Sequence, residues 1–407
     1  MIVKTVKGLY TQAIIYTDLV EESAIEQIKK LCDQKFVAGC KIRIMPDVHS
    51  GAGCVIGFTA DLGELVIPNI VGVDIGCGML TVCLGQTEID FEKLDEVIKT
   101  YVPSGMNVQD DITEAFSKIN ELLCYNKLKN IEWLEKSLGT LGGGNHFIEI
   151  DKDEDNNHYL VIHTGSRNLG KQVAEYYQQL AYDILEGKYA HQEKRKSLIR
   201  EYKAMGRASE LQEALKEFDK QNVEIDLPKE LCYLVGDERA AYLHDMKICQ
   251  EFAEENRKAI ANQILNHMFQ VSLGDFDWFE TIHNYIDLKN NIIRKGAVSA
   301  QKDEVLLIPI NMRDGSLICI GKGNDEWNCS APHGAGRLFS RTEAKEKFLL
   351  DEFKDEMKTI FSSTVNESTI DECPMAYKPI DSILKNIVDT VSVVKVIKPV
   401  YNFKAAE

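Results

Sequence analysis

The fold prediction starts from residues 45–80, which read MPDVHSGAGCVIGFTADLGELVIPNIVGVDIGCGML. Seven glycines fall in these 36 residues, against 27 in all 407, so glycine is enriched roughly threefold. Short apolar runs at 54–58 and 70–73 stand between the glycines and predict strands joined by tight turns. Glycine also lets the backbone approach a ligand or another strand closely, so we expect a site in this part of the chain.

Residues before and after the glycine-rich stretch show the apolar spacing of helices. Apolar spacing predicts helices at four places and a long charged helical segment over 171–227 that ends before Pro228. The four helices are expected at 20–32, 90–101, 110–137 and 238–268. Strands are expected at 141–150 after a glycine turn, at 159–162 up to a break at 163–166, through 279–345, and at 391–397. No repeat and no Pro/Gly/Ser-rich linker divides the sequence, which favours one domain over 1–407 with a helical insertion near 171–230.

Composition excludes several protein classes. Hydrophobic residues make up 44% and charged residues 27%, which is ordinary for a globular protein and unlike collagen, disordered chains or simple coiled coils. The net charge of −17 disfavours nonspecific coating of DNA and binding to anionic membranes. A polyanionic substrate stays open, because a local basic cleft or bound cations can hold it.

The cysteines and the apolar runs indicate a compartment. No run of 18 apolar residues exists and the first four residues, MIVK, start no apolar signal segment, so we expect no membrane association. Eleven cysteines without a secretion signal favour a reducing, cytoplasmic setting with mostly free thiols.

Two glycine-flanked segments carry candidate metal or phosphate ligands. Asp74 and Cys77 lie three apart in VDIGCG, and a carboxylate with a thiolate suits a borderline or soft divalent cation. In LGGGNHF, residues 141–147, three glycines precede Asn145 and His146 and free the backbone to approach a phosphate or metal-bound anion. A turn aspartate beside a core cysteine, and a plain glycine turn, are the structural alternatives.

Three further segments place histidine beside polar residues. His163 stands at the end of an apolar strand, and Arg167 follows, whose guanidinium can bind a phosphate through two N–H groups. His283 directly precedes Asn284. His333 stands between Pro332 and GAG, where it could act as a nucleophile on phosphorus while Arg337 neutralises the phosphate. The alternatives are a hydrogen-bonded structural histidine at 163 and an ordinary loop at 333, and a segment like that of His283 is structural in most proteins.

The five segments together, in this order, resemble the RtcB family of RNA ligases. DIGCG, GGGNHF, HTGSR, HN and HGAGR form a specific combination, and the resemblance runs from residue 46 to residue 404. It implies an α+β fold with a β-sheet core that carries the site and helices around it. It also implies an enzyme that uses GTP and Mn²⁺ to join RNA 2′,3′-cyclic phosphate or 3′-phosphate ends to 5′-hydroxyl ends.

The resemblance further implies roles for individual residues. Asp74, Cys77 and His146 would hold one Mn²⁺, and Cys77, His163 and His283 a second. His333 would take GMP, and Asp47, Arg167 and Arg337 would be further catalytic residues. The nucleotide would contact Asn145, His146, Phe147, Ile148, Glu149, His283, Asn284, Pro309, Ile310, Asn311, Met312, Ser316, His333, Gly334, Ala335, Gly336 and Lys404.

The sequence departs from the family pattern at two places, which indicates a divergent bacterial branch with an RNA substrate of its own. Residues 309–315 read PINMRDG where the family has Pro-Gly-Ser-Met-Gly, so Ile310 adds bulk beside the nucleotide. Pro332 replaces a serine and is expected to stiffen the loop before the nucleophile.

Several alternatives stay open on the sequence alone. Cys and His ligands bind Zn²⁺ more tightly than Mn²⁺, so the purified protein could carry zinc. A two-metal phosphoesterase that only opens cyclic phosphates would need the same metal ligands. A non-catalytic RNA-binding protein would use the charged segment 171–230, which includes the basic residues 194–196, as a docking arm, although a solvated helical surface fits its charge pattern better. We expect a monomer whose partners are RNA with broken ends and GTP.

Overall fold

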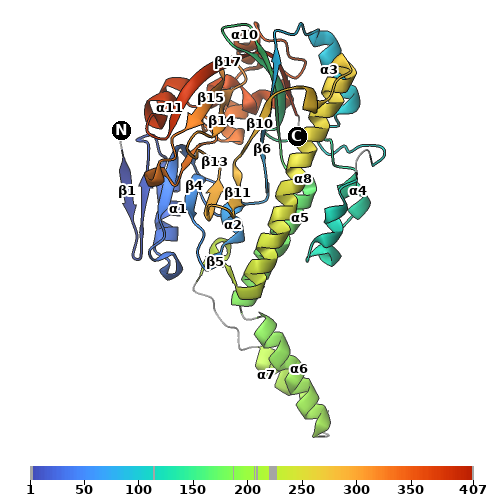
Figure 1. Ribbon diagram of the computed structural model, residues 1–407. Coiled ribbons are helices and arrows are strands. Elements are labelled where there is room, and N and C mark those ends of the chain that lie inside the picture. Colours follow the sequence, from blue (N-terminus) through green and yellow to red (C-terminus); the bar gives the residue numbers. More distant parts are fainter. Residues whose placement is uncertain are drawn as a thin grey trace.

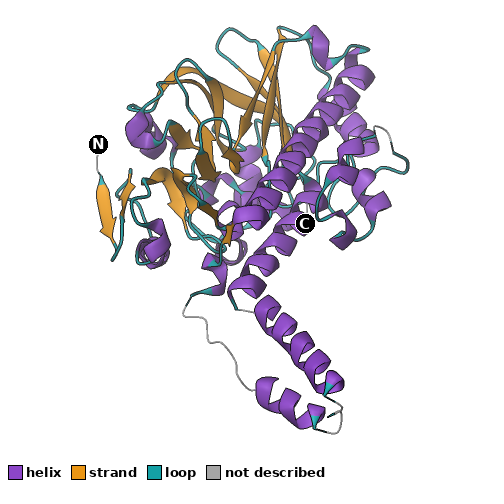
Figure 2. Cartoon of the chain, turned by 60° about the horizontal axis from the view of Figure 1, so that its bottom comes forward, coloured by secondary structure: helices purple, strands orange, loops and turns teal. Residues whose placement is uncertain are grey.

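A computed structural model describes residues 3–112, 115–186, 188–205, 207, 210–219 and 227–405. Its strands form two large sheets that lie against each other, and helices cover their outer sides (Figures 1 and 2). This arrangement confirms the α+β class, with a sheet core surrounded by helices.

The larger sheet has seven strands, each antiparallel to its neighbours. In spatial order they are β10 (Trp278–Ile282), β6 (Gly78–Gly85), β8 (His158–Thr164), β7 (Phe147–Lys152), β17 (Val391–Lys404), β15 (Gly315–Gly321) and β14 (Val305–Asn311). The sheet curls until its two edge strands meet, since the Leu307 nitrogen on β14 donates to Thr281 Oγ1 on β10 at 2.9 Å. Its concave side therefore becomes an almost closed interior.

The smaller sheet has six strands, of which only the β2–β3 pair is parallel. Their order is β1 (Lys4–Lys7), β2 (Gln12–Ile15), β3 (Ile42–His49), β4 (Ile56–Asp61), β12 (Ile292–Lys295) and β11 (Asn284–Asp287). Two short antiparallel pairs accompany the sheets, β13 (Ala297–Ser299) with β16 (Ser330–Pro332), and β5 (Leu65–Val66) with β9 (Leu234–Val235).

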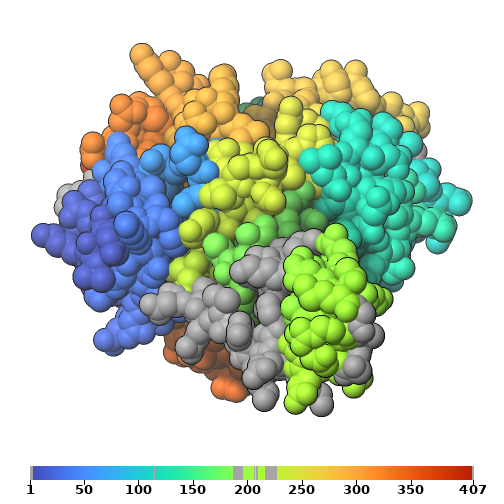
Figure 3. Space-filling view, turned by 90° about the horizontal axis from the view of Figure 1, so that it is seen from below, coloured from blue at the N-terminus to red at the C-terminus, as the bar shows by residue number. Residues whose placement is uncertain are grey.

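The α-helices are α1 (Glu22–Cys32), α2 (Pro68–Val71), α3 (Phe91–Tyr101), α4 (Ile131–Glu135), α5 (Arg167–Leu185), α6 (Lys188–Ala204), α7 (Leu211–Asp219), α8 (Gly236–Phe269), α9 (Arg341–Lys347), α10 (Leu350–Met357) and α11 (Ile380–Ile387). Helix α8 runs along the larger sheet, and its Ile260 and Ile264 pack with Ile148 and Ile162 of that sheet. Helices α6 and α7 extend away from the rest of the molecule (Figure 1). From below, the described parts of α6 and α7 stand in front of the body (Figure 3).

Three expected helices are confirmed, and one is largely wrong. Helices α1, α3 and α8 match the expectations for 20–32, 90–101 and 238–268. The range 110–137 instead holds 3₁₀ helices at Ser117–Glu121 and Tyr125–Lys127 and the short helix α4. The buried carboxylate of Asp245 explains part of this, because it accepts from the backbone nitrogens of Leu123 and Cys124 at 2.8 and 2.9 Å. A continuous helix would use these two groups internally.

The expected strand at 70–73 is also wrong. Pro68 occupies the first helical turn, where its missing N–H costs nothing, and begins α2; Gly72, with φ +87°, ends it. Strand β4 begins at Ile56 rather than at residue 54, and β17 extends the run at 391–397 to Lys404. Strand β8 continues through His163 to Thr164, where we expected a break.

Most of the described residues of 171–227 are helical; they form α5, which begins at Arg167, then α6 and α7. In the basic cluster 194–196, the side chains of Lys194 and Arg195 lie outside the described part of the chain. No helix among the described residues is long and apolar enough to span a bilayer.

Candidate active site

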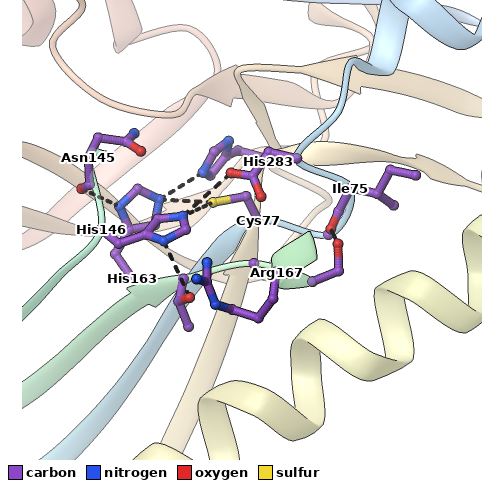
Figure 4. A network of polar contacts seen from close by, with 12 residues as sticks. Ile75, Cys77, Asn145, His146, His163, Arg167 and His283 are labelled. Carbon is purple, nitrogen blue, oxygen red and sulfur yellow. Dashed lines mark hydrogen bonds and ion pairs between the residues drawn. The ribbon is translucent and has the colours of Figure 1, made fainter. Parts of the chain in front are cut away.

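The strand pairing brings one cysteine, one aspartate and three histidines together. Asp74 and Cys77 lie in the loop before β6, and His163 pairs with Met79 of β6 and Phe147 of β7. His146 directly precedes β7, and His283 lies between β10 and β11. Cys77 and the three histidines are all at most 5% exposed, so the cluster is largely dehydrated (Figure 4).

The distances within this cluster fit metal coordination. Cys77 Sγ lies 3.6 Å from His146 Nε2 and 3.3 Å from His163 Nε2. His163 Nε2 lies 3.0 Å from His283 Nε2, and His146 Nε2 lies 3.5 Å from Asp74 Oδ2. Ligands that bind one ion at about 2.0–2.3 Å stand roughly 3–4 Å apart. The described residues thus offer two three-ligand sets, Cys77–His163–His283 and Asp74–Cys77–His146, which have Cys77 in common.

Backbone carbonyls orient two of the imidazoles. Nδ1 of His146 lies 2.8 Å from the Leu141 carbonyl oxygen, and Nδ1 of His163 lies 3.2 Å from that of Asn145. A carbonyl oxygen only accepts, so each Nδ1 carries the hydrogen and each Nε2 turns its lone pair toward Cys77. The Nε2 lone pairs of these two histidines point toward the same place, which is the arrangement found in cation-binding sites.

Burial keeps the imidazoles of His163 and His283 neutral and makes the thiolate of Cys77 depend on a cation. It lowers the pKa of His163 far below the usual range and that of His283 to about 3, with neighbouring imidazoles adding to both shifts. Burial, then the Asp74 carboxylate, raises the pKa of Cys77 well above that of a free thiol. Burial, the largest single effect, acts against ionisation of Asp74 too, but His146, Cys77 and His283 together outweigh it and lower the pKa of Asp74. Neutral imidazoles and a nearby carboxylate favour a divalent cation, which would in turn ionise the thiol.

His333 is held beside this cluster by Asp47. Its Nδ1 lies 2.6 Å from Oδ2 of the fully buried Asp47, and its backbone nitrogen donates to the same oxygen at 3.1 Å. Gly336, with φ +75°, lets the loop close over Asp47, because a Cβ at this position would stand 2.4 Å from the Asp47 carbonyl oxygen. Because Nδ1 is occupied by Asp47, Nε2 of His333 is free to react with a ligand. The ring centroid of His333 lies 4.8 Å from that of His283.

A cavity of about 360 Å³ adjoins His333 and the metal-ligand cluster. Seventeen of the residues proposed from the sequence line it: Asp74, Asn145, Phe147, Glu149, His163, His283, Asn284, Pro309, Ile310, Asn311, Met312, His333, Gly334, Ala335, Gly336, Arg337 and Lys404. The Ile310 side chain, 2% exposed, packs in a hydrophobic cluster with Val298 and Leu317, so the core takes up most of its added bulk.

Six proposed residues lie outside the cavity lining, and two of them are the metal-ligand candidates Cys77 and His146 described above. Ile148 points to the opposite face of β7 from Glu149 and is buried in the core against α8. Ser316 is fully buried opposite Pro309, and its hydroxyl has no hydrogen-bond partner among the described residues. Asp47 lies behind His333, and Arg167 lies beside the metal-ligand cluster (Figure 4).

Arg167 packs flat against the glycine turn. Its Nε donates to Thr140 Oγ1 at 3.2 Å, and a Cβ on Gly142 would stand 1.9 Å from the guanidinium carbon. Burial lowers the pKa of Arg167, while Asp74 and Cys77 counteract the shift. Arg167 thus places a positive charge beside the candidate ligands.

The guanidinium of Arg337 is hydrogen-bonded to other residues of the protein. Its guanidinium donates to Glu372 at 3.1 Å, to the Asp371 carbonyl oxygen at 2.6 Å and to the Phe339 carbonyl oxygen at 3.0 Å. Glu372 also takes ion pairs from Lys404 at 2.9 Å and from Arg341 at 3.2 Å. These cations outweigh the effect of burial and lower the pKa of Glu372 to about 2. Arg337 therefore belongs to a charged cluster at the cavity wall.

Five polar residues of the cavity wall were not predicted from the sequence: His49, Arg341, Glu372, Tyr377 and Asn402. One of them could have been found by extending the strand expected at 391–397 as far as Lys404, because Asn402 stands two before Lys404 and so shares its face of β17. Glu372 and Tyr377 lie in an irregular stretch, where no periodicity distinguishes a site residue from a surface residue.

Comparison with known proteins identifies relatives over nearly the whole chain. The family model described as tRNA-splicing ligase RtcB matches residues 27–133 and 123–405. The RNA-splicing ligase RtcB of Escherichia coli K12 is 30% identical over 421 aligned residues, which cover 94% of each chain. The RNA-splicing ligase RtcB1 of another Escherichia coli strain is 31% identical with the same coverage. The tRNA-splicing ligase RtcB of Nanoarchaeum equitans is 26% identical and covers 84% of this chain and 83% of its own.

Proposed function

The chain belongs to the RtcB family and is an RNA ligase, and on this premise we propose that it joins RNA 2′,3′-cyclic phosphate or 3′-phosphate ends to 5′-hydroxyl ends with GTP. The observation that carries this proposal is the shared position of Cys77 between two ligand sets, with His333 next to them at a nucleotide-sized cavity. RNA repair or tRNA splicing would be the setting, as the names of the relatives suggest.

The proposed cofactors are two Mn²⁺ ions, one on Asp74, Cys77 and His146 and the other on Cys77, His163 and His283. A thiolate has lone pairs for two ions, and its charge would offset their mutual repulsion. The thiolate, imidazole and carboxylate donors fit a borderline divalent cation, and their affinity order favours Zn²⁺ over Mn²⁺. Bound cations would supply neutralisation of phosphate charge and a fixed line of attack.

The nucleophile of the proposed reaction is Nε2 of His333. Asp47 accepts the hydrogen of Nδ1, so the lone pair of Nε2 is free for the α-phosphorus of GTP. The new N–P bond forms as the bond to pyrophosphate breaks, and the Asp47 carboxylate stabilises the positive charge that develops on the ring.

The nucleotide would occupy the cavity, with Asn145, Glu149 and Lys404 on its wall. An RNA 3′-phosphate, formed by opening of a cyclic phosphate with water, then attacks the phosphorus on His333 and takes over GMP. Finally the 5′-hydroxyl of the second RNA end attacks the activated 3′-phosphate, and GMP leaves. Arg167, beside the metal ligands, is the proposed partner of an RNA phosphate.

Labelling tests the proposal directly. The protein is incubated with α-³²P-GTP and Mn²⁺ and resolved on a denaturing gel; we expect label on the wild type and none on His333→Ala. Unlabelled wild type, or labelled His333→Ala, would contradict the proposed nucleophile. A pair of RNAs with a cyclic phosphate and a 5′-hydroxyl separates ligation from simple hydrolysis, because only ligation lengthens the strand.

We also propose that residues 1–407 form one ligase domain in which 171–230 is a helical insertion, since α6 and α7 stand away from the sheets (Figure 1). A cytoplasmic setting and a monomeric state stay predictions from the sequence.

A further inference from the structure

A fully buried arginine on helix α8 contacts the backbone beside two of the candidate metal ligands. Nη1 of Arg257 donates to the Gly76 carbonyl oxygen at 2.8 Å and to the Thr164 carbonyl oxygen at 3.0 Å. Gly76 directly precedes Cys77, and Thr164 directly follows His163. One nitrogen atom of α8 thus joins the loop before β6 to the end of β8.

Strand pairing alone does not place Cys77 relative to His163. The β6–β8 ladder begins one residue after Cys77, so Cys77 lies outside it. Gly76, with φ +73°, lies so close to α8 that a Cβ would stand 3.0 Å from Ala253 Cβ. Main-chain hydrogen bonds tie this loop to residues 283 and 284, next to the third ligand, and Arg257 ties it to β8.

A contribution to stability does not account for the burial of Arg257. Its Nε donates to Glu280 Oε1 at 2.8 Å, but its Nη2 has no hydrogen-bond partner in the part of the chain that the structure describes. Removing a charge from water is costly, and an ion pair offsets that cost only when the remaining donors are satisfied as well. What Arg257 does provide is the pair of hydrogen bonds from Nη1 to the two ligand-bearing segments.

We propose that Arg257 is a positioning residue for the metal centre, which holds Cys77 at ligand distance from His163. It does so by bridging the carbonyl oxygens of Gly76 and Thr164. Cys77 Sγ and His163 Nε2 lie 3.3 Å apart, a separation that suits two ligands of one ion. This inference rests on the proposed function, because it takes these two side chains to bind a divalent cation.

Titration of the metal-free, full-length protein with Co²⁺ tests the inference, because a thiolate bound to Co²⁺ produces a charge-transfer band in the near ultraviolet. The variant is the double substitution Arg257→Met with Glu280→Gln, which leaves no buried charge without its partner. Its urea unfolding midpoint should stay near that of the wild type. Half-saturation of the band should nevertheless need about 10- to 100-fold more Co²⁺, the loss typical of removing a residue that orients a metal ligand.

The matched control is Arg294→Met with Asp287→Asn. It removes another fully buried arginine together with its carboxylate partner, 3.1 Å away, and neither residue contacts a candidate ligand. The control should bind Co²⁺ as the wild type does. A loss as large as that of the Arg257 variant would overturn the inference, because it would show that removing any buried ion pair weakens the metal centre.

Arg257→Lys keeps the inference testable if the double variant does not fold. Lysine retains a positive charge for Glu280, but one ammonium nitrogen cannot occupy both the Nε and the Nη1 positions, so Co²⁺ binding should weaken here too. Wild-type affinity in either folded Arg257 variant overturns the inference alone. A wild type that shows no thiolate band with Co²⁺ overturns both the inference and the proposed metal site.

Discussion

Oδ2 of Asp47 contacts both Nδ1 and the backbone nitrogen of His333, at 2.6 and 3.1 Å. One buried carboxylate oxygen therefore sets the tautomer of the imidazole and the position of its loop, across 286 residues of sequence. Pro332, at the end of β16, restricts the backbone just before His333. The proposed nucleophile is thus already positioned in the protein without substrate.

Asp47→Asn should lower the rate of His333 guanylylation by at least about 100-fold, because a neutral amide stabilises the developing positive charge on the ring less well. The Mn²⁺ content should stay unchanged, since Asp47 is in neither ligand set. Single-turnover labelling with α-³²P-GTP measures the rate. If the variant were labelled as fast as the wild type, the carboxylate of Asp47 would not assist His333.

Cys77→Ala should cost more bound metal than His146→Ala. Cys77 belongs to both candidate ligand sets, whereas His146 belongs to one, so the His146 variant keeps Cys77, His163 and His283 for an ion. Mass spectrometry of metals after dialysis against Mn²⁺ or Zn²⁺ gives the stoichiometry. Cys83→Ser, at a cysteine outside both sets, serves as the control and should retain all bound metal. Equal losses in the two variants would argue against a shared sulfur.

Arg167→Ala should reduce ligation by at least about tenfold while guanylylation of His333 proceeds normally. The reason is that Arg167 lies beside the metal ligands and not on the cavity wall. Gly142→Ala should give the same pattern, because a Cβ there would displace the guanidinium. Rates of both steps on one enzyme preparation make the comparison, and a parallel loss of guanylylation would place Arg167 in the nucleotide site instead.

Glu372→Gln should destabilise the protein by about 3 kcal/mol at neutral pH. The cations around Glu372 depress its pKa in the folded protein to about 2, below the unfolded value of 4.5. A depressed carboxyl pKa stabilises the fold above the unfolded pKa, and this contribution is lost as the pH falls from about 4.5 toward 2. The difference between variant and wild type should accordingly be smaller at pH 3.5 than at pH 7.

Urea unfolding at the two pH values measures that difference. Glu96→Gln, at an exposed position, should change the free energy of unfolding little at either pH. A pH-independent difference for the Glu372 variant would assign its effect to packing rather than to charge.

Local sequence patterns were sufficient for several parts of the structure. The apolar spacing in α1, α3 and α8 depends on one helix face meeting the core, which the sequence displays directly. The helix predicted from similar spacing over 110–137 was largely wrong. The carboxylate of Asp245, more than 100 residues away, accepts hydrogen bonds from the backbone N–H groups of Leu123 and Cys124. A long-range hydrogen bond of this kind leaves no mark in the local pattern.

By itself the sequence determined the chemical types at the site: a thiol, a carboxylate and imidazoles in glycine-flanked loops, in an order typical of one enzyme family. Tertiary structure alone decided which of these groups meet, since Cys77, His163 and His283 approach within hydrogen-bond or ligand distance only through the pairing of β6, β8 and β10. It also decided that Asn402 faces Glu149 and that Ile148 does not face the cavity. Side-chain chemistry is a property of each residue, whereas distance and burial depend on strand register, which many separate contacts along the chain establish together.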